Sequence, residues 1–182
     1  MIAALVTVSI ALAGYIATYL NGLRLTQRQE RLARITRQLA EFYGPLLAME
    51  EVGLLSYAAF SERHSRPDGQ SPFDHDGTPT DQELAEWRIW LSTVFIPNIK
   101  KMREIVVSKA DLIIEAEMPP ALIQLCAHAA GYEITAARWG EGDYRENFSA
   151  IPYPRLEITR YVRKSFRDLK REQNRLLGGR RH

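Results

Sequence analysis

The sequence has almost no cysteine, and it has no charged residue in its first 23 positions. Cys126 is the single cysteine among 182 residues, which excludes an internal disulfide framework and fits a reducing compartment. No spacing of Cys and His matches a zinc site. The alternation of apolar and polar residues that is typical of β-strands is also missing, and this absence favours an all-α fold. At 46% hydrophobic and 25% charged residues, the chain has the composition of a folded domain.

The uncharged N-terminal run, from Ile2 to Leu23, is long enough to cross a bilayer. A helix rises about 1.5 Å per residue, so these residues can cover ~30 Å of hydrocarbon, and we expect residues 1–23 to be a transmembrane anchor. Ala11-Leu12-Ala13 fits a signal-peptide cleavage site, but no Lys or Arg precedes the run and the run continues past that site. Five arginines follow the run, so the positive-inside rule predicts an outer N-terminus and a cytoplasmic C-terminal domain.

Small residues recur at helical spacing within the predicted span. Such faces let two helix backbones approach closely in lipid, although an alanine-rich span also produces these spacings by chance. The residues of this membrane-association face are Ser9, Ala13, Ala17, Gly14 and Thr18. The lipid bilayer is therefore one expected partner, and self-association through this face stays an open alternative.

The net charge of +2 conceals two basic ends around an acidic middle. Residues 24–41 carry a net charge of +3, residues 155–182 carry +7, and the rest of the chain carries −8. The basic ends can face anionic lipid, for which Arg24, Arg28 and Arg31 are the candidate contacts, or they can pair with the acidic middle. Nucleic acid is not expected as a partner, because the domain as a whole is not strongly basic.

Beyond Leu23 the apolar residues follow the three-to-four spacing of amphipathic helices. The pattern predicts a transmembrane helix that continues into a cytoplasmic bundle of about four to five helices. Helices are expected over about 45–63, 120–139 and 154–177, with Val52 and Leu55 on the apolar side of the first and Ile134 inside the second. The expected parts are a transmembrane anchor over 1–23, a juxtamembrane helix and a kinked second helix over 24–63, a loop over 64–80, a helical bundle over 81–177 and a basic tail over 178–182. Thr80 and Glu83 have the spacing of a capping box at the start of the bundle.

Gly44 and Pro45 interrupt the longest helical pattern of the chain. Proline lacks the amide donor and disfavours the helical conformation of the residue before it. The pair therefore predicts a kink or a new helix start, and a hinge at which the juxtamembrane helix folds back. Pro97 predicts a second kink, near Ile96.

Asp74-His75-Asp76-Gly77-Thr78 is the string that comes nearest to a catalytic motif. It is similar to the nucleophile motif of haloacid-dehalogenase-type phosphatases, in which the motif follows a buried β-strand. The residues before it do not have a strand pattern, and no alternation of strands and helices follows. We therefore expect a polar turn at this place and no enzyme activity.

Three other features have a structural and a functional interpretation. His128 lies two residues after Cys126, on a different helix face, which favours a hydrogen-bonded core histidine over a catalytic pair. Trp87 and Trp90 are expected as core and interface anchors rather than as a ligand cage. Residues 140–154 are expected to form a loop held to the core by aromatic and ion-pair contacts. No metal, no cofactor and no small-molecule substrate is expected.

Residues 34–47, with Glu117-Met118-Pro119-Pro120 and Gly131-Tyr132-Glu133, resemble a group of uncharacterised bacterial single-span membrane proteins with a cytoplasmic helical domain. The resemblance implies a location in the bacterial inner (plasma) membrane. It implies no activity, because the group has none that is established.

These observations predict a membrane-anchored helical scaffold or adaptor that acts through a protein partner or through self-association on the cytoplasmic side. The alternative is a membrane-active oligomer, a pore or effector, that assembles through the transmembrane and juxtamembrane helices.

Overall fold

The structure, a computed structural model, describes residues 2–66, 71–73 and 77–178, and for residues 2–11 and 13 it describes the backbone alone. These parts of the chain contain helices and turns and no strand, so the predicted all-α class is confirmed. The α-helices are α1 (Ile2–Arg37), α2 (Gly44–Arg63), α3 (Asp81–Trp90), α4 (Ile96–Ser108), α5 (Pro120–Gly140) and α6 (Arg155–Leu176). Two π-helical turns, η1 (Gln38–Tyr43) and η2 (Leu91–Phe95), and one 3₁₀ turn, η3 (Ala110–Leu112), connect some of them.

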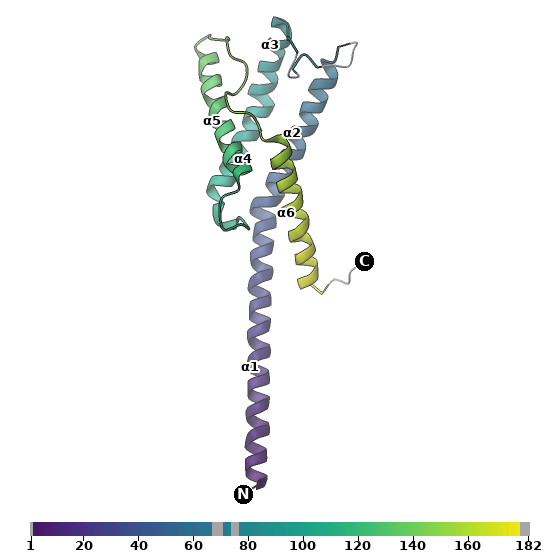
Figure 1. Ribbon diagram of the computed structural model, residues 1–182, viewed down its shortest axis with the longest axis vertical. Helices are drawn as coiled ribbons and strands as arrows, with labels where there is room; N and C mark the ends of the chain where they lie inside the picture. Colours follow the sequence, from purple (N-terminus) through teal and green to yellow (C-terminus); the bar gives the residue numbers. More distant parts are fainter. Residues whose placement is uncertain (1, 67–70, 74–76, 179–182) are drawn as a thin grey trace.

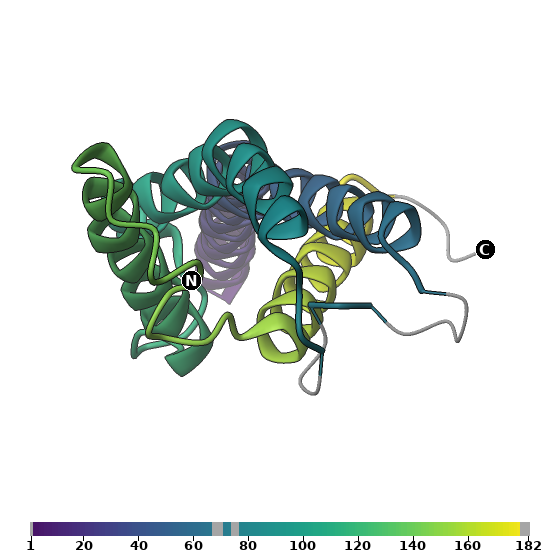
Figure 2. The same ribbon diagram turned by 90° about the horizontal axis from the view of Figure 1, so that it is seen from above.

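Helix α1 is a long rod whose N-terminal part extends beyond the rest of the molecule (Figure 1). The other helices gather around its C-terminal end, where α2 leads on from it through η1. Seen from above, α2 to α6 enclose a common interior in which the core lies (Figure 2). The protein therefore consists of a helical bundle and a projecting helix.

Each π-helical turn ends two residues before a proline, Pro45 or Pro97. A proline ring collides with the carbonyl four residues earlier, and a wider turn relieves this collision. In η1 the Gly44 amide donates to the carbonyl of Leu39, five residues back. A Cβ on Gly44 would lie 2.4 Å from that oxygen, so at this turn glycine permits the close approach.

The backbone stays helical through Gly44 and Pro45, and the chain does not fold back there as expected. Figure 1 shows a change of direction between α1 and α2 instead of a reversal. The turn η2 before Pro97 has the same form, because the Ile96 amide donates to the carbonyl of Leu91. A functional hinge at Gly44 and Pro45 stays a prediction.

The core confirms most of the apolar stripes of the bundle. Residues spaced by three or four positions are buried on α4, α5 and α6, among them Met102, Leu122 and Ile158. Three apolar residues that were expected inside are exposed instead: Val52 and Leu55 on α2, and Ile134 on α5. The capping box at the start of α3 is present, with Thr80 and Glu83 bonded to each other's backbone amides at 2.6 and 3.3 Å.

Helix α6 lies beside the C-terminal part of α1, as Figure 1 shows. Arg28 donates from Nε to the carbonyl oxygen of Leu176 at 2.9 Å, and Arg31 donates from Nε to Glu172 at 2.5 Å. Two of the three arginines expected to contact lipid are thus paired within the chain. The basic C-terminal helix packs against the bundle along this side, with its last turn next to Arg28.

Within the residues whose side chains are described, no helix is both long enough and apolar enough to cross a membrane. The first part of the expected anchor, including Ser9 and Ala13 of the small-residue face, lies outside those residues. Gly14, Ala17 and Thr18 of that face are exposed on α1. The Thr18 hydroxyl donates to the carbonyl of Gly14 at 2.9 Å.

Candidate functional site

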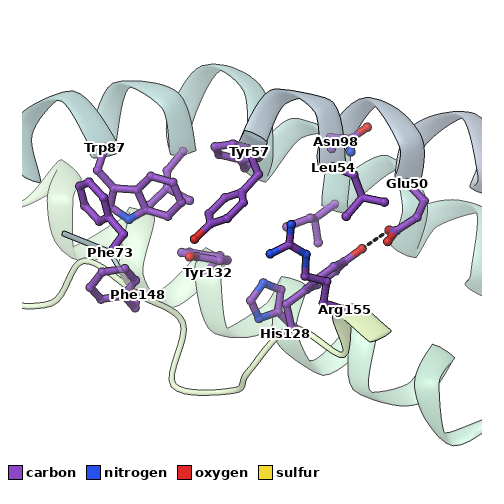
Figure 3. Close-up of a pocket in the computed structure, with 15 residues that line it drawn as sticks. Glu50, Leu54, Tyr57, Phe73, Trp87, Asn98, His128, Tyr132, Phe148 and Arg155 are labelled. Atoms are coloured by element: carbon purple, nitrogen blue, oxygen red, sulfur yellow. Dashed lines mark hydrogen bonds between the residues drawn. The ribbon is translucent and has the colours of Figure 1, made fainter. Parts of the chain in front are cut away.

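A cavity of about 310 Å³ opens between α2, the α3–η2–α4 segment, α5 and the chain that leads into α6. Its lining is divided into two ends (Figure 3). One end is aromatic and includes Phe73, Trp87, Phe95 and Phe148. The other end is polar and includes Glu50, Asn98, His128, Tyr153 and Arg155, with Tyr57 and Tyr132 between the two ends.

The aromatic end is part of the hydrophobic core and is rigidly held. Trp87 is buried, and its ring centroid lies 5.4 Å from those of Phe73 and Phe95 and 6.0 Å from that of Phe148. Its indole N–H donates to the carbonyl of Asn147 at 3.1 Å. Trp87 is thus the core anchor that was expected, but it also presents a face to the cavity.

Glu50 is a carboxylate buried in the middle of the bundle, with 2% of its surface exposed. One of its oxygens accepts a hydrogen bond from the Tyr153 hydroxyl, and the other lies 2.5 Å from Thr159 Oγ1, whose single proton is shared with the carbonyl oxygen of Arg155 at 2.6 Å. Burial, together with the adjacent Glu50 carboxylate, raises the pKa of Tyr153, so this hydroxyl stays a donor. Both carboxylate oxygens of Glu50 therefore contact protein hydroxyls.

Arg155 is the first residue of α6 and lies at the polar end of the cavity. Its guanidinium carbon is 4.8 Å from the centroid of the Tyr57 ring, a cation–π distance. The described residues place no carboxylate oxygen within 4.0 Å of it. The guanidinium is thus fixed by an aromatic face while its N–H donors stay available.

His128 faces the cavity from α5, packed against the rings of Tyr132 and Tyr153 at centroid distances of 4.9 and 5.2 Å. Its Nδ1 lies 2.5 Å from the carbonyl oxygen of Ile151. A carbonyl can only accept, so Nδ1 carries the proton and Nε2 of the neutral ring is an acceptor. Burial lowers the pKa of His128, although the bond to Ile151 opposes this effect. The expected hydrogen-bonded core histidine is present, and it is also part of the cavity wall.

The segment between α5 and α6 lies back along α5 and closes one side of the cavity. Its backbone carbonyls accept bonds from Trp87, Thr135 and Trp139, and Ser149 bonds to the carbonyl of His128. A Cβ on Gly131 of α5 would lie 2.2 Å from Ser149 Oγ, so glycine permits this close approach. The expected loop over 140–154 is held to the core in this way, although Gly140 still belongs to α5.

The other sequence candidates lie away from this cavity or outside the described residues. Asp74, His75 and Asp76 are not described, and the strand that a phosphatase motif requires is absent from the described parts of the chain. Cys126 is half-buried and does not line the cavity, and burial raises the pKa of its thiol. Trp90 packs on Phe60 and Phe95 rather than into the cavity. Where the chain is described, no group of three or more His, Cys, Asp or Glu residues could hold a metal ion.

The fold and the cavity together define an all-α bundle on a projecting N-terminal helix, with a cavity of small-molecule size between its helices. Comparison of the chain with protein-family models, with curated proteins and with solved structures finds no match.

Proposed function

We propose that the protein is a helical adaptor anchored in the bacterial inner membrane by residues 1–23, with its bundle on the cytoplasmic side. The observation that carries the proposal is the projecting part of α1, along which large apolar side chains are exposed to solvent. They are Leu12, Tyr15, Ile16, Tyr19, Leu20 and Leu23, each between 42% and 69% exposed.

Large apolar side chains exposed along a helix are stabilised when lipid or another protein buries them. Burying one large apolar side chain contributes about 1.5–3 kcal/mol, so six of them along one rod favour insertion or association strongly. The residues around them carry no charge as far as Arg24, which favours hydrocarbon over a second protein as the cover. Five arginines from Arg24 to Arg37 then favour a cytoplasmic bundle.

The base of the bundle supports a position at the membrane surface. The last turn of α6 is bonded to Arg28, which is one helical turn, about 6 Å, beyond Arg24 along α1. Basic side chains of α6, including Arg171 and Arg175, are exposed near this end. A basic surface at this height suits the headgroups of anionic lipid.

Adaptor activity through self-association rests on the small-residue face of α1. Gly14, Ala17 and Thr18 are exposed, and the Thr18 hydroxyl is already bonded to its own helix, so the face can be covered closely by another helix. A ring of associated spans would instead make a membrane-active oligomer, which is the second candidate function.

The native mass of the full-length protein in detergent, corrected for bound detergent, tests the proposal. We expect a discrete small oligomer that Gly14→Leu converts to a monomer. The matched control is Tyr19→Leu, which places the same side chain on the opposite side of α1 and should leave the mass unchanged.

Two results would count against the adaptor. A monomeric full-length protein from which a lysate pull-down recovers no specific partner contradicts it. A large assembly that releases dye from liposomes supports the membrane-active oligomer in its place.

A further inference from the structure

The cavity between the helices has the size and the lining of a small-molecule site. Its volume of about 310 Å³ is at the lower end of the range for ligand pockets, roughly 300–1,000 Å³. Figure 3 shows the aromatic rings of Phe73, Trp87 and Phe148 at one end and the charged groups at the other. A ligand that fills both ends has an apolar body and a polar head.

The charged group of the cavity that has no described polar partner is the Arg155 guanidinium. Glu50 is buried, and each of its oxygens lies within hydrogen-bond distance of a protein hydroxyl, on Tyr153 or on Thr159. The Arg155 guanidinium is stacked on Tyr57 and has no carboxylate partner among the described residues. When an aromatic ring packs on the flat face of a guanidinium, the N–H donors along its edge can still bind a carboxylate or phosphate through two parallel hydrogen bonds.

The aromatic lining of the apolar end favours an aromatic body. The Trp87 and Phe148 rings, from α3 and from the loop before α6, contact each other with centroids 6.0 Å apart, and both line the cavity. An aromatic ring that packs against them gains offset or edge-to-face contacts that a branched aliphatic body does not gain. Phe148 is 47% exposed, so it lies at the mouth of the cavity where a ligand would enter.

The distance from the expected membrane favours a dissolved ligand over a bilayer lipid. Glu50 follows Arg24 by 26 residues of nearly unbroken helix, which corresponds to roughly 40 Å at ~1.5 Å per residue. Helices α2, α3 and α5, which line the cavity, lie at the end of the molecule away from the projecting part of α1 (Figure 1).

We infer that this cavity is a binding site for a small aromatic acid, with the ring against Trp87 and Phe148 at the aromatic end and the carboxylate on Arg155. The inference does not depend on the oligomeric state, and only the preference for a dissolved ligand over a bilayer lipid rests on the proposed anchor. A ligand in the cavity contacts α2, α3, α5 and the loop that leads into α6.

Isothermal titration calorimetry on the full-length protein in a mild detergent, with detergent-matched blanks, tests this site. The probes are 2-naphthoate, 2-naphthamide and 2-naphthylmethylamine, which share one ring system and differ in the charge of the head. We expect saturable binding of 2-naphthoate, with the amide and the ammonium compound at least about tenfold weaker.

Two variants distinguish the contribution of the charged head of the ligand from that of its ring. Arg155→Gln should weaken 2-naphthoate about tenfold and leave 2-naphthamide unchanged, whereas Phe148→Ala should weaken both. Arg160→Gln is the matched control, because Arg160 is exposed on the same helix and outside the cavity. Both test residues are substantially exposed, and circular dichroism before each titration verifies that the variants are folded.

Three results would overturn the inference. These are equal affinities for the acid and the amide, tighter binding of the ammonium compound, and no saturable heat from any of the three probes at millimolar concentration. A loss of 2-naphthoate binding in Arg160→Gln equal to that in Arg155→Gln would also overturn it.

Discussion

A chain of hydroxyl groups connects η1 to α6 and to the loop before α5. Removing the hydroxyl of its first member, Tyr43, tests how much this chain stabilises the fold. Tyr43 is fully buried; its hydroxyl accepts from the Ile114 amide at 3.1 Å and lies 2.9 Å from the Tyr161 hydroxyl. Tyr161 donates in turn to Glu115 at 2.9 Å, so Tyr43 donates to Tyr161. Burial raises the pKa of both tyrosines, so both act as neutral hydroxyls.

Tyr43→Phe removes two hydrogen bonds in the core and should lower the free energy of unfolding by about 1–3 kcal/mol. Each bond contributes about 0.5–1.5 kcal/mol, and an orphaned buried group costs more. Tyr161→Phe also removes two bonds, but Tyr161 is half-buried and Glu115 is exposed, so water replaces part of the loss. We expect about 0.5–1 kcal/mol for this variant.

Urea unfolding of the full-length protein in detergent, followed by tryptophan fluorescence, measures both losses because all three tryptophans lie in the bundle. The two variants share one bond, so the double variant should lose about 1 kcal/mol less than the sum of the single losses. Equal losses for the two single variants, or strict additivity, would refute the hydroxyl chain.

Three further outcomes follow from particular contacts. Burial holds the pKa of His128 below its ordinary 6.5, so the unfolded chain takes up a proton that the folded chain does not, and stability should fall as the pH drops below about 6.5. Urea unfolding between pH 5 and 8 should show a shallower fall of stability for His128→Gln. An unchanged dependence of stability on pH in this variant contradicts the argument. Gly131→Ala should cost about 1–2 kcal/mol in thermal unfolding despite the better helix propensity of alanine, because the new Cβ displaces Ser149 Oγ. Adding Ser149→Ala to Gly131→Ala should recover part of that loss. If Gly131→Ala alone is more stable than the unchanged protein, the loop does not pack as closely on α5 as described. Pro45→Ala should leave the distance between spin labels on the exposed faces of α1 and α2 nearly unchanged, since the helix already continues through Pro45. If the distance between the labels grows by the length of a full helical turn, about 5 Å, the result argues against this geometry.

The helices could be predicted from the sequence because their signals are local. Apolar spacing, the Thr80 capping box and the prolines at helix starts gave boundaries within one or two residues for α2, α5 and α6. The π-helical turns were not predicted, since proline alone signals a disturbance and not its form. The hydrogen bonds that define that form, from Gly44 to Leu39 and from Ile96 to Leu91, involve the backbone of the folded helix.

The cavity could not be predicted, because its lining comes from five separate stretches of the chain. One local signal was present on α2. Glu50 shares the three-to-four spacing of Leu46, Gly53, Tyr57 and Phe60, so it falls on the buried face of that helix. A carboxylate at the centre of an apolar stripe indicates a buried polar network. Placing Val52 and Leu55 on the buried side of α2 assigned the wrong face of this helix to the core, so the position of Glu50 was not recognised.

The orientation of the bundle relative to a membrane is the central claim and can be measured directly. A green fluorescent protein fused to the C-terminus fluoresces only if that end stays in the cytoplasm, whereas alkaline phosphatase fused there is active only outside it. We predict a fluorescent fusion that remains in the membrane fraction after alkaline carbonate extraction, and an inactive phosphatase fusion. Fluorescence released into the supernatant by carbonate, or an active phosphatase, would contradict the anchor or its orientation.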